Sequence, residues 1–184
     1  MSGIPEHLKV VHRRIDTAPN GQVPEPWRRA GVFAIGGLTD VGFADDTDLL
    51  LVLSSQGRGI YDCTTGERVE RDRSEDFPHD PANLIAPGFG ILEGVSVRTA
   101  GMYGGGLCRV TADGWSVECV TLHWPEEILL LVEPWHSIYA DPARGKAEFH
   151  RLATEHEVRA FGFSPTGRSL VIATSSDVTV FTRG

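Results

Sequence analysis

The sequence of 184 residues contains few cysteines, no long apolar run and a shortage of basic residues. Its three cysteines, Cys63, Cys108 and Cys119, are an odd number and form neither a CxxC pair nor a cluster with histidines. We therefore expect neither a disulfide scaffold nor a structural zinc site. The longest apolar runs, residues 49–53 and 128–132, are far below the roughly 20 residues that a membrane-spanning helix needs.

The N-terminal segment MSGIPEHLKVVHRRID also lacks the apolar stretch of a secretory signal. These absences predict a cytoplasmic protein that does not contact a membrane. The stretch HLKVVHRRI is the one arguable amphipathic helix, and no other segment has a convincing helical period.

The charge balance is acidic, with 17 lysine and arginine residues against 25 aspartate and glutamate residues and a net charge of −8. Nucleic-acid affinity comes mainly from basic side chains, so we expect no nucleic-acid partner. An acidic surface instead favours a basic protein partner. Residues 1–30 carry a local charge of +2. We expect them to form an extension that packs on a single acidic domain, residues 31–184.

Signatures of catalysis are missing as well. The sequence has no GxSxG elbow, P-loop or HExxH motif, and no GxGxxG that opens a helix. The glycine run at residues 104–106 precedes no predicted helix, so it is interpreted as an inter-strand loop rather than a phosphate cradle. We expect no cofactor, and no catalytic residue is assigned.

What the sequence does contain is an internal repeat. The segment DVGFADDTDLLLVLSSQGRGIYDCTTGERVERD, from Asp40, returns 79 residues later as CVTLHWPEEILLLVEPWHSIYADPARGKAEFHR, from Cys119. A further copy, VRAFGFSPTGRSLVIATSSDVTVFTRG, begins at Val158. The offsets indicate a period near 40 residues, which predicts a degraded copy at residues 83–118.

Each copy is predicted to be an antiparallel meander of four strands. The turns carry the Gly, Pro, Asp and Thr residues that tight reversals require, for example at residues 45–47, 65–66 and 165–167. The second strand is apolar throughout instead of alternating, which is typical of a strand that is covered on both faces.

The sequence of these copies resembles the WD40 repeat family. Tyr61-Asp62 occupies the place of the family's Trp-Asp pair, and residues 163–167, FSPTG, are similar to its Phe-Ser-Pro-Asp-Gly turn. His156, Ser175 and Asp177 lie near the positions of its buried His, Ser and Asp. The resemblance implies an all-β, propeller-like fold, although the Gly-His and Trp-Asp dipeptides themselves are absent.

The last copy ends without a fourth strand, whereas the first copy is preceded by the unassigned strand GVFAIGG. We expect residues 32–35 to supply the missing outer strand and to protect an edge that would otherwise be open. The predicted fold is thus a small propeller-like array of about four antiparallel four-stranded blades. A closed ring of four blades, an open arc and a dimer that shares one larger ring all stay open.

Aromatic and acidic turn residues are the candidate binding site. Four side chains are expected on loops that join second and third strands, and hence on one rim: Trp135, His136, Tyr103 and Arg58. Exposed Trp and Tyr residues often dominate binding energy. The alternative for Trp135 is that the N-terminal segment covers it.

Two acidic pairs fall at equivalent turns of different copies: Asp45 with Asp46, and Glu126 with Glu127. Because the two pairs belong to different blades, we expect them to lie too far apart for a pair of catalytic carboxyl groups. We expect them instead to attract a basic partner.

The function expected from these features is that of a non-enzymatic protein-binding module, such as an inhibitor or immunity-type partner of a basic protein. One alternative is an enzyme or small-ligand-binding protein that uses an axial or rim pocket with His136, His156 and acidic residues. Another is a subunit whose ring is completed by a second chain.

Overall fold

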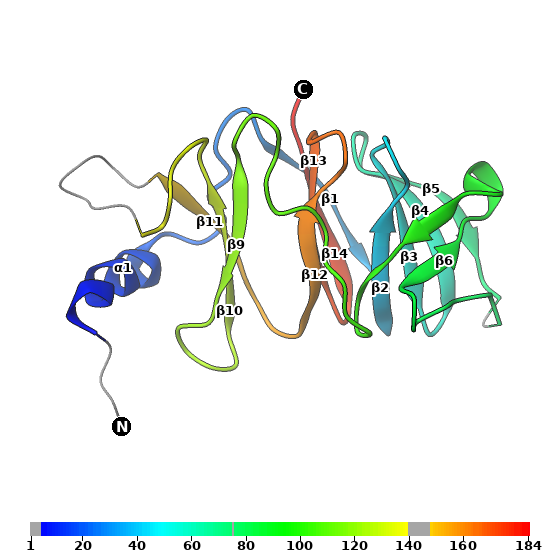
Figure 1. Ribbon diagram of the computed structural model, residues 1–184, viewed down its shortest axis with the longest axis horizontal. Helices are drawn as coiled ribbons and strands as arrows, with labels where there is room; N and C mark the ends of the chain where they lie inside the picture. Colours follow the sequence, from blue (N-terminus) through cyan, green and yellow to red (C-terminus); the bar gives the residue numbers. More distant parts are fainter. Residues whose placement is uncertain (1–4, 75, 140–147) are drawn as a thin grey trace. The chain divides into compact units, whose positions relative to one another are not determined.

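The computed structural model describes residues 5–74, 76–139 and 148–184. This part of the chain is mostly antiparallel β-sheet, with one α-helix, α1 (Glu6–Thr17), and one 3-10 helix, η1 (Gly90–Leu92) (Figure 1). It divides into two compact units. Unit 1 comprises Met1–Pro24 and Val110–His156, and unit 2 comprises Glu25–Arg109 and Glu157–Gly184.

One sheet of unit 2 joins the first strand of the chain to the last copy of the repeat. Its order is β1-β14-β13-β12, where β1 is Arg28–Ala34, β12 is Val158–Phe163, β13 is Ser169–Thr174 and β14 is Asp177–Thr182. Val32 pairs with Thr179 and Phe33 with Val178 in the antiparallel register. The predicted closure of the last repeat by the strand near residues 32–35 is therefore confirmed.

The second sheet of unit 2 contains the first copy of the repeat. Its order is β5-β4-β3-β2-β8, with β2 at Leu38–Phe43, β3 at Leu49–Ser54, β4 at Gly57–Asp62, β5 at Glu67–Asp72 and the short β8 at Ala100–Gly101. The strands from β2 to β5 form the predicted four-stranded meander.

Strand β3 is apolar from Leu49 to Leu53 because both of its faces are covered. Leu50 and Val52 share a buried cluster with Val171 and Val180 of the other sheet. Leu51 and Leu53 belong to a different cluster, which η1 and the hairpin of β6 (Ile85–Pro87) and β7 (Ser96–Arg98) help to form.

The expected copy at residues 83–118 does not form a four-stranded unit. Its residues pair as the two-stranded β6-β7 sheet and as β8 at the edge of β2. Residues 107–110 of this copy contribute only isolated bridges, between Cys108 and Phe163 and between Val110 and Ser116. The glycine-rich composition of this segment explains the difference, because glycine leaves strands without side chains to pack.

Unit 1 contains the second copy as a three-stranded sheet in the described residues. Its order is β11-β10-β9, with β9 at Ser116–Val120, β10 at Glu127–Val132 and β11 at Phe149–Glu155. The sequence predicts a four-stranded meander for this copy, as it does for the others. That prediction is wrong in the described part, because β11 pairs directly with β10 and residues 137–139 are not in a strand.

Helix α1 folds with unit 1. The segment has the amphipathic pattern that the sequence indicated, and Ile15 joins Ile128, Leu130 and Val132 of β10 in one buried cluster. The two units thus do not follow a boundary between residues 30 and 31. The division into a 1–30 extension and a 31–184 domain stays a prediction.

The WD40 resemblance implies three buried polar residues, and none of the three is fully buried in the structure. His156 is exposed, and Ser175 and Asp177 are half-buried. The described sheets contain four, five, three and two strands instead of four blades of four strands.

Candidate functional site

Trp135 is a large apolar side chain of unit 1 that is exposed to solvent. It lies in the turn after β10, and its side chain is 84% exposed. Its backbone is left-handed, with φ of 65°, a conformation that costs free energy for a residue other than glycine. The Trp135 N–H donates to the carbonyl of Gly114, at 3.4 Å.

The indole of Trp135 lies against the backbone of the neighbouring turn at Gly114. A methyl group added to Gly114 would approach Cε2 of the indole to 2.9 Å, so a residue without a side chain is needed at this position. Gly114 also has a φ of 95°, which favours glycine. The ring is thus supported from one side by backbone while most of its surface faces solvent.

His136 is exposed beside Trp135. Its Nδ1 lies 3.0 Å from the carbonyl oxygen of Pro134, and because a carbonyl can only accept, Nδ1 carries the hydrogen of this bond. The backbone N–H of His136 donates to the carbonyl of Glu133 at 3.1 Å. The turn between residues 133 and 136 therefore holds both predicted side chains, Trp135 and His136, at one end of β10.

Two further aromatic residues of unit 1 are exposed. Trp124, in the connection between β9 and β10, is 87% exposed, and Tyr139 is 67% exposed. Trp124 lies within a turn that the Glu126 N–H closes by donating to the His123 carbonyl, at 2.8 Å. Tyr139 was not singled out, because an isolated tyrosine carries no local signal of exposure.

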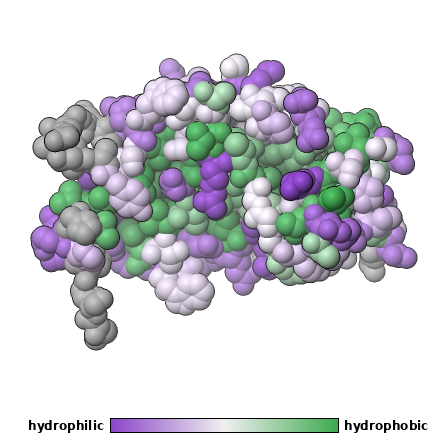
Figure 2. All heavy atoms as spheres, in the orientation of Figure 1, coloured by the Kyte–Doolittle hydropathy of each residue, from purple (hydrophilic) through white to green (hydrophobic). Residues whose placement is uncertain are grey.

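An apolar cavity of about 150 Å³ lies between α1 and the sheet of unit 1. Its walls include Leu8, Val11 and Ile15 of the helix, Val120 and Leu122 at the end of β9, and Ile138, with Tyr139 also lining it. In the space-filling view, hydrophobic residues reach the surface in the region of α1 and β9, among polar ones (Figure 2).

Polar contacts hold α1 at the wall of this cavity. His123 Nε2 lies 3.2 Å from Asp16 Oδ1, and the rings of His12 and His123 meet edge to face, with centroids 5.7 Å apart. Arg151 donates to the Asp16 carbonyl at 3.3 Å. The helix is therefore fixed by contacts to both β9–β10 and β11.

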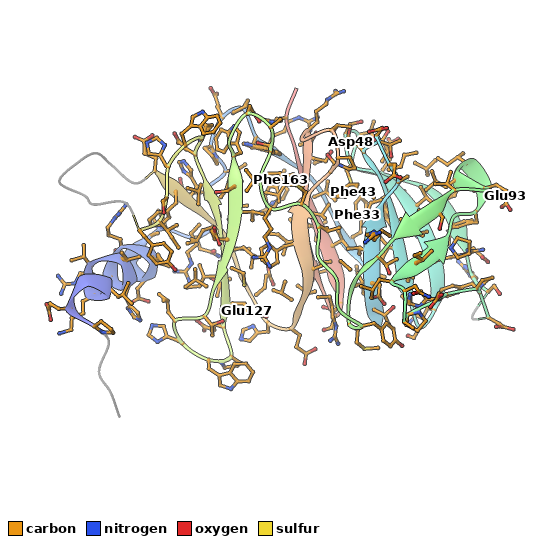
Figure 3. The ribbon with its side chains drawn as sticks, viewed as in Figure 1. Phe33, Phe43, Asp48, Glu93, Glu127 and Phe163 are labelled. Atoms are coloured by element: carbon orange, nitrogen blue, oxygen red, sulfur yellow. The ribbon has the colours of Figure 1, made fainter. Side chains whose placement is uncertain are left out.

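The acidic pair Glu126 and Glu127 lies at the start of β10, at the opposite end of the strand from Trp135. Figure 3 labels Glu127 at this end. A third glutamate, Glu133, accepts a 2.7 Å hydrogen bond from His150 Nε2. This bond, with smaller help from Glu148, holds the pKa of Glu133 below its usual value.

The remaining predicted residues lie in unit 2. Asp45 and Asp46 are exposed in the turn between β2 and β3, as predicted, and Asp46 has a left-handed backbone. Tyr103 is half-exposed and meets the ring of His79, with centroids 5.6 Å apart. Because Trp135 and His136 belong to unit 1, the single rim that joins them to Tyr103 stays a prediction.

The placement of Arg58 on a loop is wrong. Arg58 lies within β4, and its guanidinium is held between Asp72, at 2.9 Å, and the carbonyl of Pro87, at 3.0 Å. It also lies over the ring of Phe89, at 4.6 Å. Ser74 N–H and Arg58 together hold the pKa of Asp72 below its usual value. Arg58 thus packs a buried corner instead of meeting a partner.

Asp48 forms a hydrogen-bond network that its position in an acidic turn does not indicate. Its carboxylate accepts hydrogen bonds from the hydroxyl groups of Ser164 at 2.7 Å, Thr166 at 2.9 Å and Ser169 at 2.7 Å. Figure 3 labels Asp48 near the turns that it connects. The contact joins the β2–β3 turn to the β12–β13 turn, so Asp48 is a structural residue of unit 2.

Three arginines of β5 and its end form a basic cluster that the sequence analysis missed. Arg68, Arg71 and Arg73 line one polar cavity of unit 2. Strict alternation along a strand would place Arg68 and Arg71 on opposite faces. The register of the sheet shows that the two arginines share one face.

In the described ranges, no three His, Cys, Asp or Glu side chains gather as a metal-binding group. No helix of the part described is long and apolar enough to cross a membrane. Comparisons of the chain with family models, curated proteins and solved structures find no match.

Proposed function

We propose that the protein is a non-enzymatic binding module, which recognises a basic protein partner through the exposed aromatic surface of unit 1. The aromatic residues of this surface are Trp135 at one end of β10 and Trp124 at the other, with Tyr139 beside the apolar cavity next to α1. The observation that carries the proposal is the exposure of two indoles, at 87% and 84%. A buried aromatic side chain removes about 150–250 Å² from water, worth roughly 4–6 kcal/mol at about 25 cal/mol per Å².

Two further features support this assignment. The backbone geometry of Gly114 and Trp135 presents the indole in one orientation, which lowers the entropy lost on binding. Glutamates lie close to both tryptophans in the sequence: Glu126 and Glu127 after Trp124, and Glu133 before Trp135. A partner with lysines or arginines around an apolar centre is complementary to this surface.

The proposal extends to the fold. We propose that the sheets are blades of a small propeller-like array, in which the β1–β14 pairing closes one blade. The antiparallel four-stranded order of β1-β14-β13-β12 and the β2–β5 meander support it. An inhibitor or immunity-type role follows from such a rigid scaffold, because it presents loops with little loss of conformational entropy on binding.

The test is affinity capture from the native host, followed by titration of the captured protein against purified variants. We expect one basic protein to be captured, Trp135→Ala and Trp124→Ala each to weaken its binding at least tenfold, and binding to weaken as salt rises. Val32→Ala is the matched control, because Val32 is an exposed apolar residue of β1 in unit 2. Its affinity should equal that of the wild type.

Two outcomes would overturn the proposal. One is a partner whose affinity is unchanged by both tryptophan substitutions. The other is the absence of any captured protein together with measurable turnover of a small molecule. Circular dichroism of each variant separates loss of binding from loss of fold.

A further inference from the structure

Unit 2 contains a polar cavity of about 500 Å³ that has no role in the proposed protein-binding surface. It is bounded by the end of β1 at Gly36, by Ser54 and Gln56 at the β3–β4 turn, and by three arginines of the outer strand. Its volume lies within the range of small-ligand sites, about 300–1,000 Å³.

A β-bulge places the three arginines on one face. In the register of β4 and β5, Tyr61 pairs with Arg68 and Ile60 with Glu70, so Val69 is an extra residue. Gly59 then pairs with Arg71. Since Tyr61 and Gly59 are two residues apart and share a face, their partners Arg68 and Arg71 do as well, and Arg73 follows two residues later.

The same bulge turns the acidic residues of β5 away from the cavity. Asp72 pairs with Arg58 at 2.9 Å. Glu70 accepts the backbone N–H of Ile91 at 2.8 Å. Both carboxylates are thus engaged on the opposite face, although the charge of Arg71 also helps to lower the pKa of Asp72.

The cavity therefore concentrates positive charge in an acidic protein. Within the part of the chain that the structure describes, none of Arg68, Arg71 and Arg73 forms an ion pair. Arg71 is held in place by a 2.6 Å hydrogen bond to the carbonyl of Gln56. Arg68 and Arg73 are exposed. Three guanidinium groups repel one another unless an anion lies between them.

We propose that this cavity binds a small phosphorylated ligand with at least two phosphate groups. Each guanidinium presents five N–H donors in a planar fork that fits phosphate oxygens two at a time. Arg71, already positioned by Gln56, anchors one phosphate, and Arg68 and Arg73, on the same face, bind the second. The ligand is an inorganic pyrophosphate or the diphosphate part of a nucleotide, because both present this chemistry.

The test measures binding of inorganic pyrophosphate to the full chain by calorimetry at about 0.15 M salt. Arg68→Gln and Arg73→Gln are the informative variants, because neither side chain has a hydrogen bond or ion pair within the described structure whose loss would unfold the protein. We expect each to weaken pyrophosphate binding at least tenfold without a change in Tm. Arg98→Gln, at an exposed arginine outside the cavity, is the control and should bind as the wild type does.

Competition distinguishes the possible ligands. Tighter binding of ADP than of pyrophosphate would assign the site to a nucleotide, and the reverse order to the inorganic ion. The proposal is overturned if pyrophosphate does not bind at millimolar concentration, if Arg98→Gln weakens binding as much as Arg68→Gln, or if citrate binds as tightly as pyrophosphate. The last result would show an unselective attraction of anions.

Discussion

At the scale of single residues, the contact between Glu133 and His150 links the turn before Trp135 to β11. The hydrogen bond from His150 lowers the pKa of Glu133 in the folded protein. A carboxyl with a lowered folded pKa contributes stability above its unfolded pKa, near the usual 4.5. This contribution is lost as pH falls through the lower, folded pKa.

We therefore predict that His150→Ala raises the pKa of Glu133. A carbon-13 NMR titration of the Glu133 carboxyl measures it. The free energy of unfolding should fall in the variant at pH 7, and its difference from the wild type should shrink towards pH 3. His156→Ala, at an exposed histidine of the same unit, should leave the titration of Glu133 unchanged. An unchanged pKa in His150→Ala would contradict the assignment.

Individual side chains also mark where sequence reasoning succeeds and fails. Asp45 and Trp135 lie in turns, as predicted, because the residues that favour a turn are neighbours in the sequence. Arg58 was misplaced because its partners Asp72 and Pro87 come from distant parts of the chain. The residues next to a charged side chain in the sequence do not indicate that distant partners will surround it.

At the scale of elements, α1 is held by its apolar face. Ile15 is 1% exposed in the cluster with β10, whereas Val10 of the same helix is 51% exposed. We predict that Ile15→Ala lowers the free energy of unfolding by about 2–4 kcal/mol, as deletion of a buried aliphatic side chain does. Val10→Ala should change it by less than about 0.5 kcal/mol.

Chemical denaturation followed by circular dichroism measures both variants of α1. Equal, small effects would mean that the helix does not pack on the sheet of unit 1. The position of α1 was harder to predict than its existence. The period of HLKVVHRRI indicates an apolar face, but nothing local identifies the strand that covers it.

At the scale of the whole molecule, long-range contacts decide how the repeated sheets are joined. Within unit 2, Asp48 of one copy receives hydrogen bonds from Ser164, Thr166 and Ser169 of another. Two of these donors, Ser164 and Ser169, are buried. Removal of their common acceptor leaves the buried Ser169 hydroxyl without an acceptor, which costs about 1–3 kcal/mol, and removes the hydrogen bonds that Ser164 and Thr166 donate to a charged group.

We predict that Asp48→Ala lowers the free energy of unfolding by about 2–4 kcal/mol, measured by urea denaturation. The matched control is Asp45→Ala in the same turn, where the exposed carboxylate has no such network and the change should stay within about 0.5 kcal/mol. If the two variants were equally stable, the Asp48 contacts would not join the sheets in solution.

The sequence by itself determined the buried strands and their turns. The apolar runs at residues 49–53 and 128–132 lie within β3 and β10, because a strand covered on both faces needs apolar side chains at every position. It also predicted the pairing of the first and last strands, since the final repeat lacked one strand and the segment before the first repeat supplied a spare.

Only the tertiary structure decided which strands became neighbours and which side chains met. The pairing of β11 with β10 and the network around Asp48 depend on partners far away in the sequence, and the bulge at Val69 depends on the register between β4 and β5. One extra residue in a strand reverses the face of every side chain beyond it. No local pattern could therefore have brought the three arginines into one cavity.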